Sequence, residues 1–130
     1  MVSILLVSHS TKIAEGTLEL IKQMTQEKVR IEIAAGTTDG RLGTNACLIE
    51  EKIKEMWTED GVLIFVDLGS AVMSAQMALE DLEEGVKNKV FIVDAPFIEG
   101  ALIAAVEASI GKNIYEVKNA AEEAKNMNKI

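Results

Sequence analysis

The sequence predicts an α/β fold with an open, doubly wound, mainly parallel four-stranded sheet in the order 2-1-3-4, flanked by helices. Four short apolar runs alternate with longer amphipathic stretches, which is the pattern of strands joined by helical crossovers. The first run is apolar on both faces, as expected of a strand buried inside a parallel sheet. The length of 130 residues suits a single domain over 1–130, and a hydrophobic content of 48% can fill its core.

The first half of the chain begins with two predicted strands around a helix. Residues 2–7 form an unbroken apolar run and predict a buried strand. Apolar side chains recur near helical spacing over about 12–25. Residues 29–34 alternate in polarity and predict a strand that is less buried than the first. A loop rich in glycine and threonine then covers 35–44.

The middle of the chain repeats the alternation of helix and strand. A helix is predicted over about 44–56, with Thr44 or Asn45 as its N-cap. The run over 62–66 is the most strand-like in the chain, and a helix follows over about 70–84.

The last part of the chain supplies the fourth strand and two more helices. Residues 90–93 predict a buried strand, and about 97–109 predict an alanine-rich helix. A polar helix over about 114–127 closes the chain.

Composition and charge exclude several classes of protein. A formal net charge of −8 disfavours general nucleic-acid binding, which depends on Lys and Arg, and allows a basic protein partner. The single cysteine, Cys47, excludes an internal disulfide, fits a reducing compartment and is expected to be a small core residue. No apolar run approaches the roughly 20 residues that span a bilayer, and the N-terminus lacks the features of a signal peptide. We therefore expect a soluble cytoplasmic protein.

The only histidine, His9, follows the first predicted strand, at the carboxyl edge of the sheet where ligands bind in open α/β folds. Asp67 follows the strand over 62–66, and the order 2-1-3-4 brings it close to His9. A carboxylate that accepts a hydrogen bond from one ring nitrogen fixes the tautomer and leaves the other nitrogen as a nucleophile. The pair therefore suggests a histidine that accepts a phosphoryl group.

Turns at the same edge offer backbone amides and hydroxyls to a phosphate, and phosphoryl transfer needs mainly positioning and charge stabilisation. The expected phosphate-binding residues are Ser10, Gly36, Thr37, Gly43, Thr44, Gly69 and Ser70. Other interpretations stay open at this point: His9 as a capping or surface residue, Asp67 as the cap of the next helix, and the glycine-rich loop as an ordinary connection.

Other chemistries fit the sequence less well. It contains no Gly-x-Ser-x-Gly elbow, no Walker A motif and no dinucleotide fingerprint after the first strand. A metal site would need more His or Cys ligands than this chain has, so any metal would be bound by carboxylates. A receiver domain would need an acidic pair after the first strand, where this chain has Ser8 and His9. We expect no metal and no other cofactor.

Three motifs carry a family resemblance. They are Val-Ser-His-Ser-x-x-x-Ala-Glu-Gly over 7–16, Ala-Gly-Thr-x-Asp-Gly-x-x-Gly-Thr over 35–44 with one extra Thr, and Val-Asp-Leu-Gly-Ser-Ala-x-Met over 66–73. Together they resemble the phosphotransferase subunit of phosphoenolpyruvate-dependent dihydroxyacetone kinase, a family similar to the mannose-type IIA domains of the bacterial sugar phosphotransferase system. Ser10 stands where mannose-type domains usually have Gly, which favours the dihydroxyacetone branch. Asn45 and Ser74 depart from the pattern, which has Ser and Asn there.

The resemblance implies a phosphohistidine relay in which Asp67 orients His9. His9 would accept a phosphoryl group from the histidine-containing phosphocarrier protein and pass it to ADP on the nucleotide-binding subunit of the kinase. The regenerated ATP would phosphorylate dihydroxyacetone on a third subunit. The family also implies a homodimer. Because the chain ends at Ile130, without the carrier-like domains of some relatives, we expect it to depend on separate carriers.

Two other functions stay open. A mannose-type IIA domain would pass the phosphoryl group from the same histidine to a IIB protein. A regulatory module would instead change its affinity for a partner when His9 is phosphorylated. Ser10 and the Asp-Leu-Gly-Ser-Ala motif favour the kinase relay over a mannose-type domain.

Overall fold

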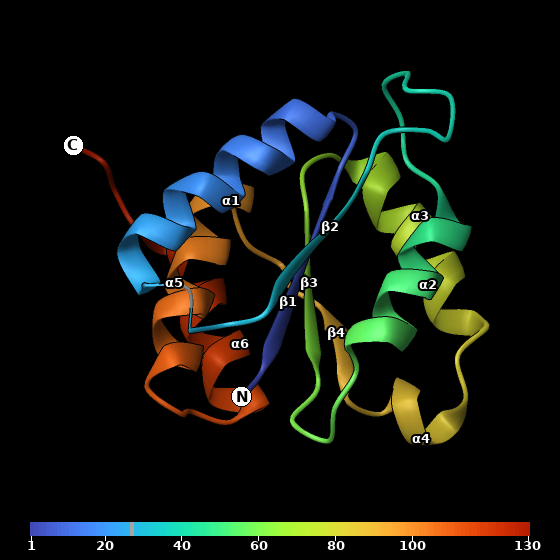
Figure 1. Cartoon of the computed structure of the whole chain (residues 1–130). Helices are drawn as coiled ribbons and strands as arrows, with labels where there is room; N and C mark the ends of the chain where they lie inside the picture. Colours follow the sequence, from blue (N-terminus) through green and yellow to red (C-terminus); the bar gives the residue numbers. More distant parts are fainter. Residues whose placement is uncertain (27) are drawn as a thin grey trace.

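In the computed structural model, which describes residues 1–26 and 28–130, four parallel strands form one open sheet in the order β2-β1-β3-β4 (Figure 1). This is the predicted order. The strands are β1 (Ser3–Ser8), β2 (Ile31–Ala35), β3 (Val62–Val66) and β4 (Val90–Ile92). Strands β1 and β3 lie side by side in the middle, with Val7 opposite Val66, so the residues that follow them meet at the carboxyl edge.

Helices cover both faces of the sheet, with α1, α5 and α6 on one side and α2 and α3 on the other (Figure 1). Their bounds are α1 (Thr11–Thr25), α2 (Ala46–Met56), α3 (Gly69–Glu80), α4 (Glu84–Lys87), α5 (Phe97–Ser109) and α6 (Ile114–Glu122), followed by the 3-10 helix η1 (Glu123–Asn126). The alternation of strands and helical crossovers therefore gives the predicted doubly wound architecture.

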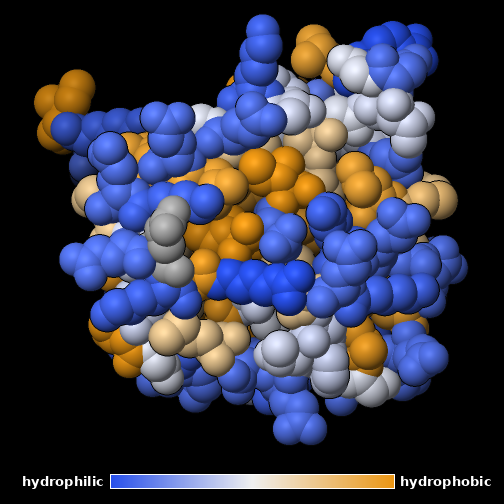
Figure 2. Space-filling model, in the orientation of Figure 1, coloured by the Kyte–Doolittle hydropathy of each residue, from blue (hydrophilic) through white to orange (hydrophobic). Residues whose placement is uncertain are grey.

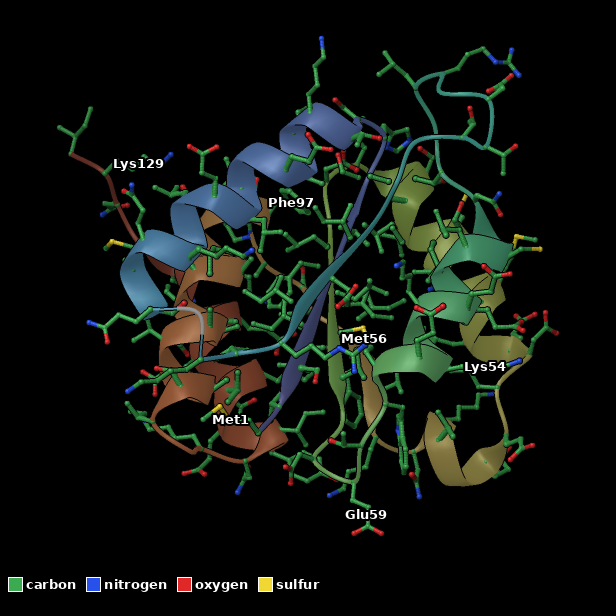
Figure 3. The ribbon with its side chains drawn as sticks, viewed as in Figure 1. Met1, Lys54, Met56, Glu59, Phe97 and Lys129 are labelled. Atoms are coloured by element: carbon green, nitrogen blue, oxygen red, sulfur yellow. The ribbon has the colours of Figure 1, made fainter. Side chains whose placement is uncertain are left out.

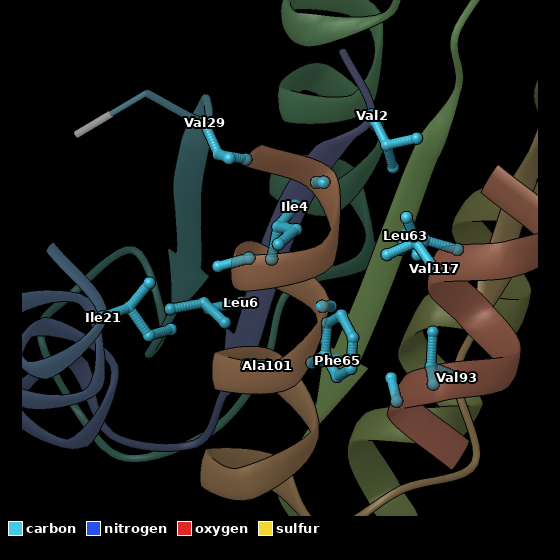
Figure 4. Packing of buried hydrophobic residues seen from close by; sticks show 14 of the residues in the cluster. Val2, Ile4, Leu6, Ile21, Val29, Leu63, Phe65, Val93, Ala101 and Val117 are labelled. Carbon is cyan, nitrogen blue, oxygen red and sulfur yellow. The ribbon is translucent and has the colours of Figure 1, made fainter. Parts of the chain in front are cut away.

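Two hydrophobic cores lie on the two faces of the sheet because successive side chains of a strand point to opposite sides. Ile4 and Leu6 of β1 face the core beneath α5, which Figure 4 shows with Phe65 and Ala101. The alternate positions of β1 face the core beneath α2 and α3. Every residue of β1 is buried, whereas β2 lies at the sheet edge and is mostly half-buried, as the sequence predicts.

Side-chain caps begin three of the helices. The Ser10 hydroxyl accepts a hydrogen bond from the backbone N–H of Ile13 at the start of α1. Asn45, one of the two predicted candidates, caps α2. Asn113 and Glu116 form a reciprocal capping box at the start of α6. These contacts satisfy N–H groups that a helix cannot satisfy internally.

The end of α3 differs from its prediction. The helix stops at Glu80 instead of about 84, and the separate short helix α4 follows a turn. Leu82 within this turn is buried in the core beneath α2 and α3, so the chain leaves the helix while still contributing an apolar contact. The last predicted helix, about 114–127, is also split, because the α-helix ends at Glu122 and η1 continues to Asn126.

Helix α2 shows how one helix divides its residues between core and solvent. Met56 points toward the sheet and is fully buried, whereas Lys54 points outward and pairs with Glu50 (Figure 3). Cys47 at the start of this helix is exposed, so its predicted place in the core is wrong. It lies in the first turn of α2.

The surface seen in Figure 2, with the β2 edge in front, has hydrophobic side chains near its centre and hydrophilic ones around them. Among the residues that the structure describes, no helix combines the length and the apolar character needed to cross a membrane.

Candidate functional site

His9 and Asp67 lie side by side at the carboxyl edge of the sheet, as the strand order predicts. His9 directly follows β1 and Asp67 directly follows β3, and the pairing of these strands sets their separation. His9 Nδ1 lies 3.0 Å from Asp67 Oδ1. The two side chains are only 23% and 13% exposed, so solvent screens their interaction less than at an open surface.

The Asp67 carboxylate is surrounded by four hydrogen-bond donors. Oδ2 accepts from the Ser8 hydroxyl at 2.9 Å and from the His9 backbone N–H at 3.0 Å. Oδ1 accepts from the Leu68 backbone N–H at 2.8 Å and faces the His9 ring. Partial burial acts to raise the pKa of Asp67, but these hydrogen bonds from His9, Ser8 and Leu68 outweigh it and hold the pKa below its ordinary value. Asp67 is therefore ionised at neutral pH.

Asp67 is not a helix cap. The N-cap of α3 is Leu68, whose side chain makes no capping hydrogen bond. The carboxylate instead lies against the histidine, so the capping interpretation of Asp67 is wrong.

The carboxylate determines which nitrogen of His9 carries the proton. An ionised carboxylate can only accept hydrogen bonds, so the neutral ring places its proton on Nδ1. Nε2 then keeps a lone pair and lies 2.6 Å from Ser70 Oγ, which donates to it. The contact between Nε2 and Ser70 is exposed, so a reactant can approach this nitrogen.

The N-terminus of α3 lies beside Nε2. Gly69 and Ser70 are the first two residues of this 12-residue helix, and no side chain caps it. The N–H groups of a first helical turn have no partner inside the helix and favour anions. Ser70, one of the predicted phosphate-binding residues, therefore lies next to Nε2, and Gly69, another of them, precedes it in the first turn of α3.

The glycine-rich loop after β2 is hydrogen-bonded to the backbone at His9. The bonds come from Gly36 and Gly43, two residues that were predicted to bind phosphate. The Gly43 N–H donates to the His9 carbonyl at 2.8 Å, and the Gly36 N–H donates to the Ser8 carbonyl at 3.1 Å. Gly36 has a φ of +73°, a conformation that side chains disfavour. Thr37 bonds within the loop, donating its N–H to the Arg41 carbonyl at 3.0 Å.

The same loop is joined to α3. Figure 1 shows the segment after β2 passing over the carboxyl edge toward the start of α3. Thr44 Oγ1 lies 2.6 Å from Ser74 Oγ, one turn beyond Ser70. Ser74, which departs from the family pattern, therefore takes part in holding the loop against the helix.

Ser10 and Ser8 lie on the other side of His9. Ser10 caps α1 through its hydroxyl and donates its N–H to Ser8 Oγ at 3.1 Å. Ser8 contacts Asp67, although it is not among the site residues that the sequence predicts. Its only signal was its place immediately before the histidine, at the end of a strand expected to be buried.

The arrangement provides a nucleophilic imidazole nitrogen with a fixed tautomer, next to hydroxyl and amide donors suited to a small anion. Within residues 1–26 and 28–130, no three His, Cys, Asp or Glu side chains lie together as a metal would require.

Comparison with known proteins gives a family match over most of the chain. Residues 3–118 match the family model EIIA-man, described as the PTS system fructose IIA component. A Listeria innocua protein named PEP-dependent dihydroxyacetone kinase 2, phosphoryl donor subunit DhaM, is 47% identical over 110 residues, covering 85% of this chain and 88% of that protein.

An Escherichia coli phosphoryl donor subunit DhaM of PEP-dependent dihydroxyacetone kinase is 41% identical over 120 residues, or 90% of this chain. The matched part is 25% of that longer protein, so the chain spans a quarter of its length.

Two solved structures share the fold. A protein of unknown function, EF1359, has a TM-score of 0.86 and 40% identity, covering 94% of this chain and 93% of that one. A phosphotransferase system component EIIA from Streptococcus agalactiae has a TM-score of 0.72 over 97% of this chain and 93% of that chain. Its identity is 11%, so this second likeness concerns the fold alone.

Proposed function

Because this chain belongs to the EIIA-man family of phosphotransferase system components, we propose that it is a phosphohistidine relay serving dihydroxyacetone kinase. One observation carries the proposal: Asp67 holds Nδ1 of His9 and leaves Nε2 exposed beside the N-terminus of α3. The names of the Listeria innocua and Escherichia coli relatives support the kinase branch.

In the proposed reaction, the lone pair of His9 Nε2 attacks phosphorus as the bond between phosphorus and the donor's nitrogen breaks. The Ser70 hydroxyl, which first donates to Nε2, turns to donate to a phosphoryl oxygen. The proton on Nδ1 stays there, and the ring gains positive charge as the new bond forms. The ionised Asp67 stabilises that charge.

The transferred group is held by donors on α3. The backbone N–H groups of Gly69 and Ser70 and the positive end of the helix would stabilise the phosphoryl oxygens. The amides of Gly36 and Gly43, which donate to the carbonyls of Ser8 and His9, would fix the walls of the site.

We further propose that the donor is the histidine-containing phosphocarrier protein and that the acceptor is ADP on the nucleotide-binding subunit of the kinase. Two exposed apolar side chains next to the pair suit brief docking of both proteins. Leu68 donates its backbone N–H to Asp67, and Leu42 directly precedes Gly43, whose N–H donates to the His9 carbonyl. The net charge of −8 favours encounter with basic surfaces. A homodimer and a cytoplasmic location stay predictions.

Reconstitution of the relay tests the proposal. The purified chain is incubated with phosphoenolpyruvate, enzyme I and the phosphocarrier protein, and intact mass is used to count acid-labile phosphoryl groups. We expect one group on the wild type and none on His9→Ala. Addition of the two kinase subunits with dihydroxyacetone should then give dihydroxyacetone phosphate. Phosphorylation without this product would favour a sugar IIA domain or a regulatory module, and labelled His9→Ala would refute the site.

A further inference from the structure

Ser8 is a fully buried polar residue that touches the catalytic pair without facing the reactive nitrogen. It is the last residue of β1, and its side chain is 0% exposed. Its backbone is fixed by the sheet, since its carbonyl accepts from the Gly36 N–H and its register partner is Ala35. A serine buried so deeply is costly unless its hydroxyl is hydrogen-bonded.

The hydroxyl of Ser8 has one proton, and its surroundings determine where that proton goes. The Ser10 backbone N–H donates to Ser8 Oγ at 3.1 Å, so this side of the oxygen acts as an acceptor. Ser8 Oγ donates its own proton to Asp67 Oδ2 at 2.9 Å. The three groups form a directed chain from the start of α1 to the carboxylate.

We propose that Ser8 is a positioning residue that holds the Asp67 carboxylate in the rotation needed to keep the His9 proton on Nδ1. Two donors hold each carboxylate oxygen: Ser8 and the His9 backbone on Oδ2, and the Leu68 backbone and the His9 ring on Oδ1. Of these four, the Ser8 hydroxyl is the one side-chain donor besides the ring itself.

Removal of this donor has a defined consequence. In Ser8→Ala, Oδ2 keeps a single backbone donor, and the carboxylate gains freedom to rotate away from the ring. The tautomer with its proton on Nε2 then becomes more populated, and that tautomer has no lone pair on Nε2 for attack. The inference rests on the proposed function only for its link to phosphoryl transfer, because the tautomer of His9 is a property of the resting protein.

The test combines ¹⁵N spectroscopy of the His9 ring with transfer kinetics. We expect wild type to show the Nδ1–H tautomer at neutral pH. We expect the Nδ1 and Nε2 resonances of Ser8→Ala to move toward each other, with phosphorylation slower by about tenfold, the loss expected when one hydrogen bond to a charged group is removed. The KM for the phosphocarrier should stay unchanged because the exposed surface is the same.

Three variants separate positioning from a general effect of a buried serine. Ser3→Ala removes the same atom from a buried position (3% exposed) at the other end of β1, away from His9. It should leave both the ring spectrum and the rate unchanged. Ser8→Thr keeps the hydroxyl and should restore both, and Ser8→Cys, with a weaker donor of similar size, should give intermediate values.

The inference is overturned if Ser8→Ala keeps the wild-type ring spectrum, or if its rate stays within about twofold of that of Ser3→Ala. Failure of the proposed function looks different. If wild-type protein does not accept a phosphoryl group on His9, the relay is refuted, whereas the ring spectra of Ser8→Ala and Ser3→Ala still decide whether Ser8 sets the tautomer.

Discussion

Replacement of Asp67 by Asn tests the role of the carboxylate most directly, because it removes the charge while keeping the size. All four groups around Asp67 donate hydrogen bonds to it, so either orientation of an Asn side chain places its NH₂ group against donors. If the NH₂ group faces the ring, Nδ1 must accept and Nε2 carries the proton, so the nucleophile is lost. If it faces Ser8 and the His9 backbone, the ring contact survives but an amide hydrogen opposes the His9 N–H.

The expected magnitude follows from the contact between Nδ1 and Oδ1. This hydrogen bond already has an ionised acceptor, and it becomes an ion pair when the ring turns cationic. A hydrogen bond to a charged group is worth about 1.5–3 kcal/mol, or a factor of about 10 to 150 in rate. A reversed tautomer adds to this loss, since the corresponding Asp-to-Asn substitution in the Ser-His-Asp triad of a serine protease lowers turnover by about 10⁴. We therefore expect phosphorylation of Asp67→Asn to be at least about tenfold slower than that of wild type.

The assay is rapid-quench transfer from radiolabelled phosphocarrier, with acid-labile phosphate measured against time. Asp94→Asn is the matched control, since Asp94 follows β4 at the same sheet edge, is 84% exposed and pairs with Lys125. It removes the same charge without a contact to His9 and should transfer at the wild-type rate. An Asp67→Asn protein that unfolds like wild type and transfers within about twofold of its rate would refute the assignment of Asp67.

Three further outcomes are expected. Ser70→Ala, which loses the hydroxyl 2.6 Å from His9 Nε2, should accept phosphate about tenfold more slowly in the same assay, and an unchanged rate would remove Ser70 from the site. The pKa of Asp67 lies below its ordinary value, so its contribution to stability is complete above that ordinary value and is lost as pH falls through the lowered one. The urea midpoint of wild type should thus fall more than that of Asp67→Asn between about pH 6 and about pH 3, and parallel curves would contradict this. Gly61→Ala should destabilise the fold by about 1–3 kcal/mol in urea unfolding, because φ is +89° and the new Cβ lies 2.6 Å from a backbone carbonyl oxygen; Gly85→Ala, with nothing within 4 Å, is its control.

The sequence predicted the bounds of an element most accurately where its local pattern of apolar residues matched the burial of that element in the fold. The strand over 62–66 is observed with the predicted bounds, because its five apolar residues fit a strand buried on both faces. The helix over 97–109 also has its predicted bounds and follows Pro96, which serves as N-cap. In both cases the neighbouring residues interrupt the pattern, so the ends are visible in the sequence.

The end of α3 shows what a local pattern misses. Between Glu80 and Gly85 the chain has no proline or glycine to stop a helix, and Leu79 and Leu82 keep the helical spacing of apolar residues. The helix nevertheless ends at Glu80, and Leu82 reaches the core from a turn. Packing against the sheet decides this boundary, and packing is a property of the whole fold.

The sequence predicted only part of the site, because some of its contacts also depend on the whole fold. The nearness of His9 and Asp67 followed from the strand order alone, since the two residues directly follow the two central strands. The partners of the loop amides did not follow, because Gly36 and Gly43 donate to carbonyls of Ser8 and His9 that only the folded register brings within reach. The sequence pattern suggests that these amides bind phosphate. In the structure they instead hydrogen-bond the loop to the end of β1 and to His9.

Ser8 is the site residue whose role is least visible in the sequence. A serine at the end of an apolar run looks like the first residue of a turn, and its side chain would then face solvent. Here β1 extends through Ser8, so the hydroxyl is buried and must find partners inside the fold. Its partners are the backbone N–H of Ser10 at the start of α1 and the Asp67 carboxylate. Ser8 directly precedes His9, the residue that Asp67 orients. The first turn of α3 therefore lies beside Nε2, while the buried end of β1 sets the tautomer that leaves a lone pair on this nitrogen.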